Sequence, residues 1–223
     1  YEAPFVTGLS GHPTGVAVNE TNYVYVGDFE NRQVLIYNGS GGLVGQWGSF
    51  GNGDGQFGIV RDIACNASGY VYVVDQSNYR VQIFDCNGNF IDKWGLPGTE
   101  PGNFSDPMGI AINSTGFVYV SDYGSDRIEV FDAQGTFLFQ WAVPTPMGIE
   151  IDEKGHVYVA VRDINDYRVE VFAANGTFLE GWSLNGIPGL TAGDFVPSYL
   201  ALSNTSTVYV VDSDTNSRVQ AFN

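Results

Sequence analysis

The chain has 223 residues, of which 14% are aromatic, 15% are charged and 29 are glycine. This composition favours strands and turns, so it predicts an all-β fold, and the length is typical of a single domain over residues 1–223. The formal net charge of −16 argues against partners such as nucleic acid or anionic lipid, whose affinity for proteins comes mainly from Lys and Arg. No apolar run approaches the roughly 20 residues that span a bilayer, so we expect no membrane insertion.

The sequence contains one unit five times, which is the strongest indication of its fold. In each unit an apolar run is followed by a run that begins with arginine. The apolar runs are residues 23–28, 70–75, 117–122, 156–161 and 207–212, and the arginine runs are residues 32–37, 80–84, 127–131, 168–172 and 218–222. Trp47, Trp94 and Trp141 recur every 47 residues, and Trp182 follows after 41. Each unit therefore predicts four short strands, a to d, such as strand a at residues 15–18 and strand d at residues 137–141.

The apolar run, strand b, does not alternate between polar and apolar residues. A strand has such a continuously apolar sequence when both of its faces are covered by other parts of the protein. In a β-propeller each four-stranded sheet packs between two neighbouring sheets, which provides that cover. The sequence therefore predicts a five-bladed β-propeller of four-stranded antiparallel sheets.

Particular segments of these units resemble those of NHL-repeat proteins. Residues 107–112 (Pro-Met-Gly-Ile-Ala-Ile) followed by residues 118–122 (Val-Tyr-Val-Ser-Asp) match the NHL pattern closely, and so does the loop at residues 47–57. The resemblance covers all five units and implies a propeller fold more firmly than a function. NHL propellers usually have six blades, so five units depart from the family pattern. Some NHL propellers bind RNA, but the four basic residues outside the repeats are too scattered to form a basic patch.

The two ends of the chain predict how the propeller closes. The fifth unit ends at Phe222 and Asn223 without a strand d, and Phe5 and Val6 precede the first strand a, where a strand d belongs. We expect this N-terminal strand to join the last blade, which removes open sheet edges. A domain cut short of a sixth blade is the alternative. The first residue is Tyr1 and not Met, so we expect a processed or excised chain, for which a removed signal peptide is one explanation.

Asn-x-Ser/Thr sequons suggest an extracellular glycoprotein. The seven asparagines are Asn19, Asn38, Asn66, Asn103, Asn113, Asn175 and Asn204. Six of them fall in predicted a–b or c–d turns, which lie on one face of a propeller. Asparagine also favours turns for backbone reasons, but this preference does not explain the hydroxyl two residues later. We therefore expect N-linked glycans on the face that carries these turns.

Cys65 ends a strand a and Cys86 follows strand c of the same blade, so both lie at one end of a single sheet. Strand b separates them, and two strand spacings are about 10 Å, beyond ordinary disulfide reach unless the strand ends bend together. We expect a disulfide between them, with two free thiols as the alternative.

The loops between strands b and c pair an aspartate with an arginine in every unit. The pairs are Asp28 with Arg32, Asp75 with Arg80, Asp122 with Arg127, Asp163 with Arg168 and Asp212 with Arg218. Because the pair repeats, we interpret it as a structural brace. A ring of these carboxylates that binds Ca²⁺ is the weaker alternative, since the ligand spacing of an EF-hand is absent. Tyr79, Tyr123 and Tyr167 in the same loops are the candidate contact residues.

The sequence offers no catalytic motif. Zinc catalysis needs three protein ligands, and the only histidines are His12 and His156. We therefore expect no enzyme activity, cofactor or metal site. The predicted function is a secreted structural or recognition module that contacts protein or carbohydrate, with self-assembly into a filament or surface layer as one form. A sensing or adhesion domain of a larger surface protein and a metal-dependent propeller hydrolase or lyase are the alternatives.

Overall fold

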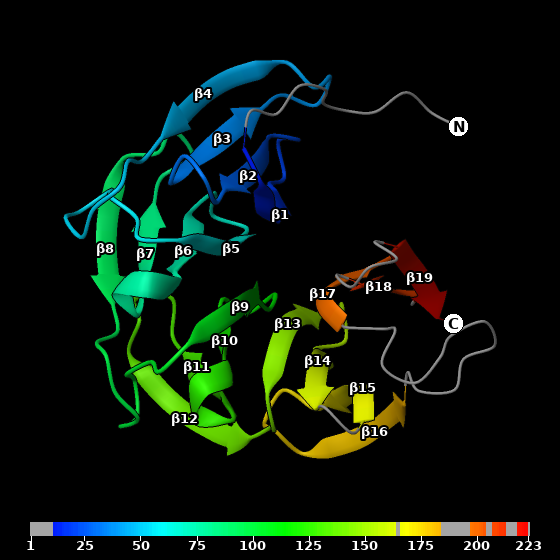
Figure 1. The fold of residues 1–223 in the computed structure, drawn as a ribbon. Coiled ribbons are helices and arrows are strands. Elements are labelled where there is room, and N and C mark those ends of the chain that lie inside the picture. The colour runs from blue at the N-terminus through cyan, green and yellow to red at the C-terminus, as the bar shows by residue number, and fades with distance from the viewer. Residues whose placement is uncertain (1–10, 164–165, 184–196, 204–206, 213–217, 223) are drawn as a thin grey trace.

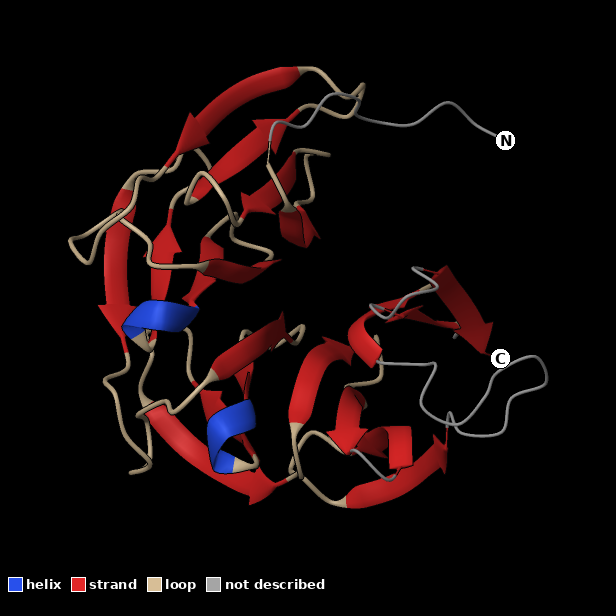
Figure 2. Cartoon of the chain, viewed as in Figure 1, coloured by secondary structure: helices blue, strands red, loops and turns tan. Residues whose placement is uncertain are grey.

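The computed structural model describes residues 11–163, 166–183, 197–203, 207–212 and 218–222. These residues form five antiparallel sheets set radially around a common axis, which confirms the predicted all-β propeller (Figures 1 and 2). Four sheets have four strands, and three strands of the fifth lie in the described residues. No described helix is long and apolar enough to cross a membrane.

The strands follow chain order within each blade. Blade 1 holds β1 (Pro13–Val18), β2 (Val24–Asp28), β3 (Gln33–Tyr37) and β4 (Leu43–Trp47). Blade 2 holds β5 (Val60–Cys65), β6 (Val71–Asp75), the short 3-10 helix η1 (Gln76–Asn78), β7 (Arg80–Phe84) and β8 (Phe90–Trp94). Blade 3 holds β9 (Pro107–Ile112), β10 (Val118–Asp122), the 3-10 helix η2 (Tyr123–Ser125), β11 (Arg127–Phe131) and β12 (Phe137–Ala142). Blade 4 holds β13 (Pro146–Ile151), β14 (Val157–Asp163), β15 (Asp166–Phe172) and β16 (Phe178–Ser183), and blade 5 holds β17 (Pro197–Leu202), β18 (Val208–Asp212) and β19 (Arg218–Phe222).

The first strand of each blade lies nearest the axis, and in blades 1 to 4 the fourth strand lies at the rim (Figure 1). Neighbouring inner strands lie side by side from β1 through β5, β9 and β13 to β17. The predicted closing strand at Phe5 and Val6 lies outside the described residues, so closure of the ring by that strand stays a prediction.

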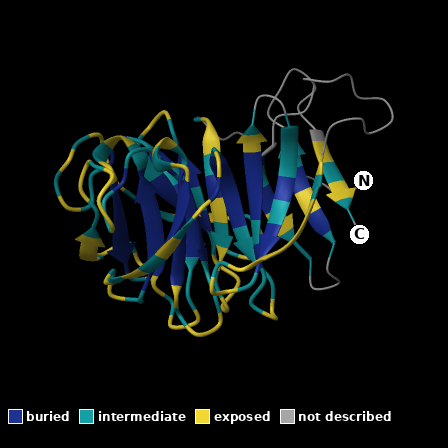
Figure 3. Cartoon of the chain, turned by 90° about the horizontal axis from the view of Figure 1, so that it is seen from below, coloured by how far each residue is buried: buried dark blue, intermediate teal, exposed yellow. Residues whose placement is uncertain are grey.

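The middle strands of the blades are buried on both faces, as their apolar sequences predict. Every residue of β6, β7, β10 and β11 is buried, whereas the rim strand β12 alternates between half-buried and exposed residues. Exposed residues gather in the turns and loops at the two ends of the blades (Figure 3). The hydrophobic core therefore consists of the side chains packed between neighbouring blades.

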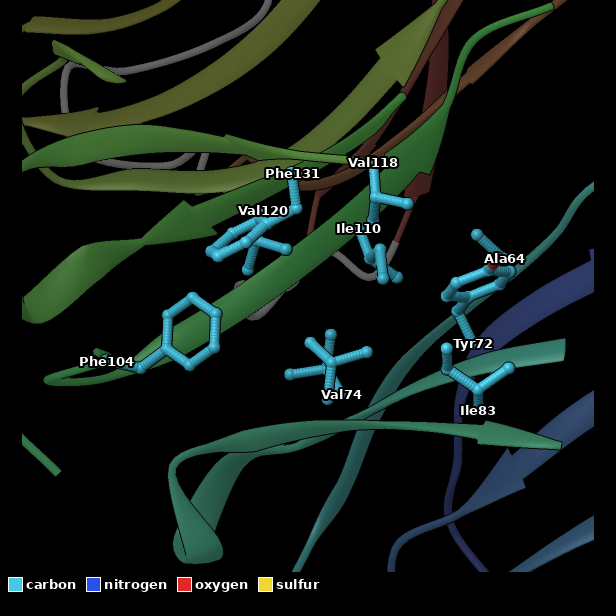
Figure 4. Packing of buried hydrophobic residues seen from close by; sticks show 10 residues of the cluster. Ala64, Tyr72, Val74, Ile83, Phe104, Ile110, Val118, Val120 and Phe131 are labelled. Atoms are coloured by element: carbon cyan, nitrogen blue, oxygen red, sulfur yellow. The ribbon is translucent and has the colours of Figure 1, made fainter. Parts of the chain in front are cut away.

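The space between blades 2 and 3 shows how these interfaces are filled. Tyr72 and Val74 of β6 pack with Ile110 of β9 and Val118 and Val120 of β10, each at most 4% exposed (Figure 4). Full burial of one such side chain contributes about 1.5–3 kcal/mol, so each interface is strongly stabilising.

At the three interfaces from blade 1 to blade 4, a tryptophan at the rim lies against a glycine of the next blade. A Cβ atom on Gly135 in the β11–β12 turn would come within 2.5 Å of Cδ2 of Trp94 on β8. Trp47 meets Gly88 in the same way, and Trp141 meets Gly176. The 47-residue tryptophan period is therefore the period of this contact between blades.

We predict that Gly135→Ala destabilises the fold more than Gly116→Ala. Both glycines have a positive φ, +83° and +86°, so alanine costs about 1–2 kcal/mol of backbone strain at either position. A Cβ on Gly116 meets no atom within 4 Å, whereas one on Gly135 collides with the Trp94 ring. Such overpacking adds about 1–3 kcal/mol, which urea unfolding of the two variants would measure. Equal losses of stability would show that the tryptophan contact does not need the glycine.

Candidate functional site

The inner strands follow a common pattern, and three residues depart from it. Each inner strand begins opposite the last residue of a repeat's strand b, which aligns their positions. The third position holds glycine in blades 1, 3 and 4 but Asp62 in blade 2 and Tyr199 in blade 5. The fifth position holds alanine in four blades but Glu150 in blade 4. All three exceptions line one cavity.

This axial cavity has a volume of about 360 Å³ and is bounded by the inner strands of all five blades. Its apolar wall includes Ile63, Ile110, Ile149 and Leu200, all at most 8% exposed. A cavity of this size, apolar with a few polar groups, is typical of small-molecule sites.

Asp62 enters the cavity from β5 and is held by two backbone donors. Its Oδ1 accepts from the N–H of Ile63 at 2.9 Å, and its Oδ2 accepts from the N–H of Ile110 in the next blade at 2.9 Å. Gly15 of blade 1 provides the space for this side chain, since a Cβ atom on Gly15 would overlap the Asp62 carboxyl. Burial raises the pKa of Asp62 to about 7, and the two hydrogen bonds and the charge of Arg61 only partly oppose this.

Glu150 reaches the same cavity from β13 in blade 4. Burial raises its pKa to about 8, and the negative charge of Asp62 adds to the increase. The charge of Asp62 therefore disfavours ionisation of Glu150, as expected for like charges in a site of low polarity.

Tyr199 connects blade 5 to blade 2 at the edge of the cavity. Its hydroxyl donates to the carbonyl oxygen of Arg61 at 3.3 Å, and the Arg61 guanidinium carbon lies 5.4 Å from the centre of its ring. Burial raises the pKa of Tyr199 to about 12, so the phenol stays neutral at physiological pH. Tyr199 and the two carboxyls form a polar cluster on an otherwise apolar axis.

The sequence-based predictions did not include these three residues. The predictions sought what the five units share, whereas Asp62, Glu150 and Tyr199 are exceptions to the shared pattern. Aligning the inner strands and marking the exceptions would have found them.

We predict that Glu150→Gln flattens the dependence of stability on pH. Because the pKa values of Asp62 and Glu150 are raised, the folded state binds more protons than the unfolded chain between about pH 4 and pH 8. The free energy of unfolding therefore falls as the pH rises through 7 and 8. Urea unfolding at pH 5.5, 7.0 and 8.5 would show a shallower decline in Glu150→Gln than in the wild type. Glu153→Gln, an exposed residue of the same blade, should keep the wild-type decline, and an unchanged decline in Glu150→Gln would contradict the assignment.

In blades 2 and 3 the predicted Asp–Arg pairs hold the loops that connect the blades. In blade 2 the Arg80 Nε lies 2.8 Å from Asp75 Oδ2, and both side chains are buried. Arg80 also donates to the carbonyl oxygens of Asn52, Gly53 and Gln56 in the loop from blade 1. Asp75 accepts from the N–H of Gly58 in that loop at 2.8 Å. The pair therefore clamps the incoming loop.

The clamp recurs in blade 3 and is looser in blade 4. Arg127 donates to three carbonyl oxygens of the preceding loop and lies 3.7 Å from Asp122. Arg168 lies 3.8 Å from Asp163 but only 2.7 Å from Glu170. In blade 5 the backbone registers Asp212 opposite Arg218, and their side chains lie outside the described part of the chain.

In blade 1 the structure differs from the predicted pair of Asp28 and Arg32. The register places Gln33, not Arg32, in the position of Arg80, and Gln33 donates to Asp28 at 3.1 Å. Arg32 takes the positive-φ position that Tyr79 occupies in blade 2, and its guanidinium lies 4.5 Å from the centre of the Phe29 ring. The prediction paired the wrong residue because two adjacent polar residues end this loop.

The sequon asparagines of the a–b turns have structural partners. The Asn66 Oδ1 accepts from the N–H groups of Ser68 and Tyr70, and its Nδ2 donates to the Tyr72 hydroxyl at 3.2 Å. Tyr72 in turn donates to the carbonyl oxygen of Ala133 in the next blade at 3.1 Å. The same chain of bonds runs from Asn19 through Tyr25 to Cys86 and from Asn113 through Tyr119 to Ala174.

The Ser or Thr hydroxyl of the sequon also makes a hydrogen bond within the turn. From the sequence, turn preference was expected to explain the asparagine but not this hydroxyl. The hydroxyls of Thr21, Ser40 and Thr115 donate to the side-chain oxygens of the asparagines two residues earlier, at 2.8–2.9 Å. Asp85, Asp132 and Asp152 accept the equivalent backbone bonds in other turns. An acceptor is therefore what the turn requires, and the sequon pattern at Asn19, Asn38 and Asn113 has a structural reason.

The remaining sequons differ in their surroundings. Asn175 is exposed at the third position of the β15–β16 turn, and its side-chain oxygen accepts from the N–H of Thr177. Asn103 is half-buried in the loop before β9, at the opposite end of the blades. Asn204 lies outside the described residues. Asn175 is thus the described sequon most open to a glycan.

We predict that Asn66→Ala lowers the free energy of unfolding by about 1–2 kcal/mol, because it removes the acceptor of the turn and the donor to Tyr72. Asn175→Ala, a sequon asparagine on the same face, should change it by less than about 0.5 kcal/mol. Chemical denaturation of unglycosylated protein from a bacterial host would measure both. Equal effects would show that the a–b asparagines do not support the turn.

The structure corrects the predicted disulfide, since Cys65 and Cys86 are both free. Strand β6 lies between β5 and β7, so the strands that flank the two cysteines are not neighbours in the sheet. Cys65 packs against the core, and burial raises the pKa of its thiol to about 12, whereas Cys86 is exposed in the β7–β8 turn.

The three loop tyrosines are not equivalent. Tyr123 and Tyr167 pack against the core between blades 4 and 5, and Tyr79 is 37% exposed. Of these predicted contact residues, Tyr79 presents the most surface.

The two histidines lie apart from the cavity. His12 pairs with Glu30 at 2.8 Å and His156 with Asp152 at 2.9 Å. Among the described residues, no three His, Cys, Asp or Glu side chains are grouped so as to hold a metal ion.

Residues 60–178, slightly more than half of the chain, match the model of a protein family described as a 6-bladed beta-propeller. The chain belongs to this family. The family description counts six blades, whereas this member forms five sheets in its described residues. No curated protein matches the chain.

Several solved structures share the fold of this 6-bladed beta-propeller family member. A streptogramin B lyase has a TM-score of 0.69 and 16% identity over 96% of this chain and 70% of its own. Virginiamycin B lyase from Staphylococcus aureus has a TM-score of 0.67 and 14% identity, over 97% of this chain and 71% of its own. A protein of unknown function from Bacteroides caccae has a TM-score of 0.71 and 13% identity, over 95% of this chain and 74% of its own. At these identities the similarity extends to the fold alone.

Proposed function

We propose that this protein is a non-enzymatic recognition propeller that binds a small ligand in its axial cavity. One observation carries the proposal: the residues that depart from the inner-strand pattern, Asp62, Glu150 and Tyr199, all line the same cavity. Glycine and alanine serve the fold at these positions in the other blades, so packing does not require a carboxyl or a phenol there. Residues that a fold does not need and that converge on a cavity support ligand binding.

The wider setting of this proposal is an NHL-type propeller that works outside the cell and carries N-linked glycan. The exposed sequon at Asn175 supports it, whereas the half-buried sequons of the a–b turns are accounted for by their hydrogen bonds. When the protein is secreted from a eukaryotic host, Asn175→Ala should lower the intact mass by one glycan. An unmodified peptide mass in the wild type would remove the glycan from the proposal.

A propeller lyase is the second candidate, because two of the three solved structures compared above are lyases. A carboxyl pair with raised pKa values can act as a general acid. The described lining of the cavity includes neither histidine nor cysteine, which favours binding over nucleophilic or zinc-dependent chemistry. Ligand recovered unchanged after incubation with the protein supports recognition, and a converted product supports the lyase.

We predict that Ala201→Phe abolishes ligand binding without removing any charge, because Ala201 lines the cavity and a phenyl ring there fills it. A panel of amines, sugars and carboxylates would be screened by thermal unfolding. At about 100 times its Kd a ligand stabilises by about 2.7 kcal/mol, which raises the Tm of a chain of this size by about 5–10 °C.

Val44→Phe is the matched control, since Val44 is 53% exposed on the rim strand β4. It should respond to the ligand as the wild type does. The proposal fails if no compound of the panel raises the Tm, or if the increase persists in Ala201→Phe.

A further inference from the structure

The titratable side chains that line the axial cavity are all acids. The described titratable side chains that line it are Asp62, Glu150 and Tyr199, and Arg61 lies behind Tyr199. Asp62 is 9% exposed and receives two backbone hydrogen bonds, about half of what a carboxylate can accept. Ionised together, the two carboxyls would leave negative charge in a mostly apolar cavity.

We propose that the ligand is a small organic cation whose ammonium group binds between the carboxyls of Asp62 and Glu150 and whose alkyl part contacts the isoleucine wall. This inference rests on the proposed binding function of the cavity. An ammonium group supplies the donors and the positive charge that the two carboxyls lack. Ile63, Ile110 and Ile149 provide the apolar surface that the hydrocarbon part requires.

The composition of the cavity favours an organic cation over the other ligand classes. An anion would face two carboxyls, and the Arg61 guanidinium is already placed against the Tyr199 ring. A divalent metal such as Ca²⁺ takes six to eight oxygen ligands, whereas no three acidic, histidine or cysteine side chains are grouped for a metal in the described residues. A neutral ligand would bring no positive charge to the carboxyl pair, for which Arg61 only partly compensates.

The charge of the whole chain supports the same class. With a formal net charge of −16 the protein attracts cations to its surface and raises their local concentration. The cavity volume of about 360 Å³ suits a molecule of modest size, which matches the ring or short chain of a simple amine.

Three probes of the same shape test the inference: cyclohexylammonium, cyclohexanol and cyclohexanecarboxylate, each titrated calorimetrically into the wild-type protein at pH 8.5. We expect cyclohexylammonium to bind at least tenfold more tightly than the other two. Binding at pH 5.5 should be at least tenfold weaker, since Asp62 and Glu150 are then protonated. At pH 7, titrations in two buffers of different ionisation enthalpy should show that binding releases protons.

Glu150→Gln and Asp62→Asn each remove one carboxyl and should weaken cyclohexylammonium binding at least tenfold. Two variants are used because either one alone could fail to fold, and the pH dependence of the wild type needs no variant. Glu153→Gln removes the same charge from an exposed position in the same blade and should bind like the wild type.

The outcomes separate this inference from the function on which it rests. Equal binding of the three probes, lost in Ala201→Phe, would overturn the cation and keep the cavity as a ligand site. Binding of calcium chloride alone would replace the organic cation by a metal. Wild-type affinity in both carboxyl variants would also overturn the inference. If neither these probes nor any compound of the wider panel binds, the proposed function fails with it.

Discussion

The contact between the rim of one blade and the outer turn of the next is the interaction on which the propeller depends. At this point a tryptophan ring lies on a glycine, and a tyrosine hydroxyl donates to the neighbouring carbonyl oxygen. The tyrosine is itself bonded to the asparagine of its own a–b turn, so one chain of hydrogen bonds joins the a–b turn of one blade to the c–d turn of the next. Because the arrangement recurs at three successive interfaces, it sets a common spacing and angle between blades.

That spacing decides what the inner strands can carry. Where blades converge on the axis, neighbouring backbones come close, and a Cβ on Gly109 would lie 2.8 Å from the carbonyl oxygen of Met147. Similarly, a Cβ on Gly148 would lie 2.7 Å from Cα of Tyr199. A larger residue at the third position is therefore possible only beside a glycine of the adjacent blade. Asp62 beside Gly15 and Tyr199 beside Gly148 both meet this condition, so the glycines of the repeat make room for the site.

The sequence could predict what the units share, and the structure adds what distinguishes them. The buried strands β6 and β10 follow from apolar runs that five units repeat, and the clamp of Asp75 and Arg80 follows from a pairing found in every loop. The axial site was not predicted, because it consists of single exceptions in a strand whose alignment depends on register. The free cysteines could not be settled by chain order, which places Cys65 and Cys86 at one end of a sheet but leaves open whether the strand ends bend together. The sequon turns could not be interpreted fully, because the bonds between hydroxyl and asparagine appear only in three dimensions.

The energetics of the axis explain why the exceptions point to function. A carboxyl whose pKa is raised by burial is less favourable in the folded state than in water at neutral pH, so Asp62 and Glu150 lower stability there. Their counterparts in the other blades avoid this cost, since those positions hold glycine, alanine or, in blade 5, the neutral phenol of Tyr199. The Asp75–Arg80 clamp is different, because its buried charges are paired and bind the loop they hold. Buried charge that is paired serves the fold, whereas acid that lines a cavity without forming an ion pair is explained by what enters that cavity.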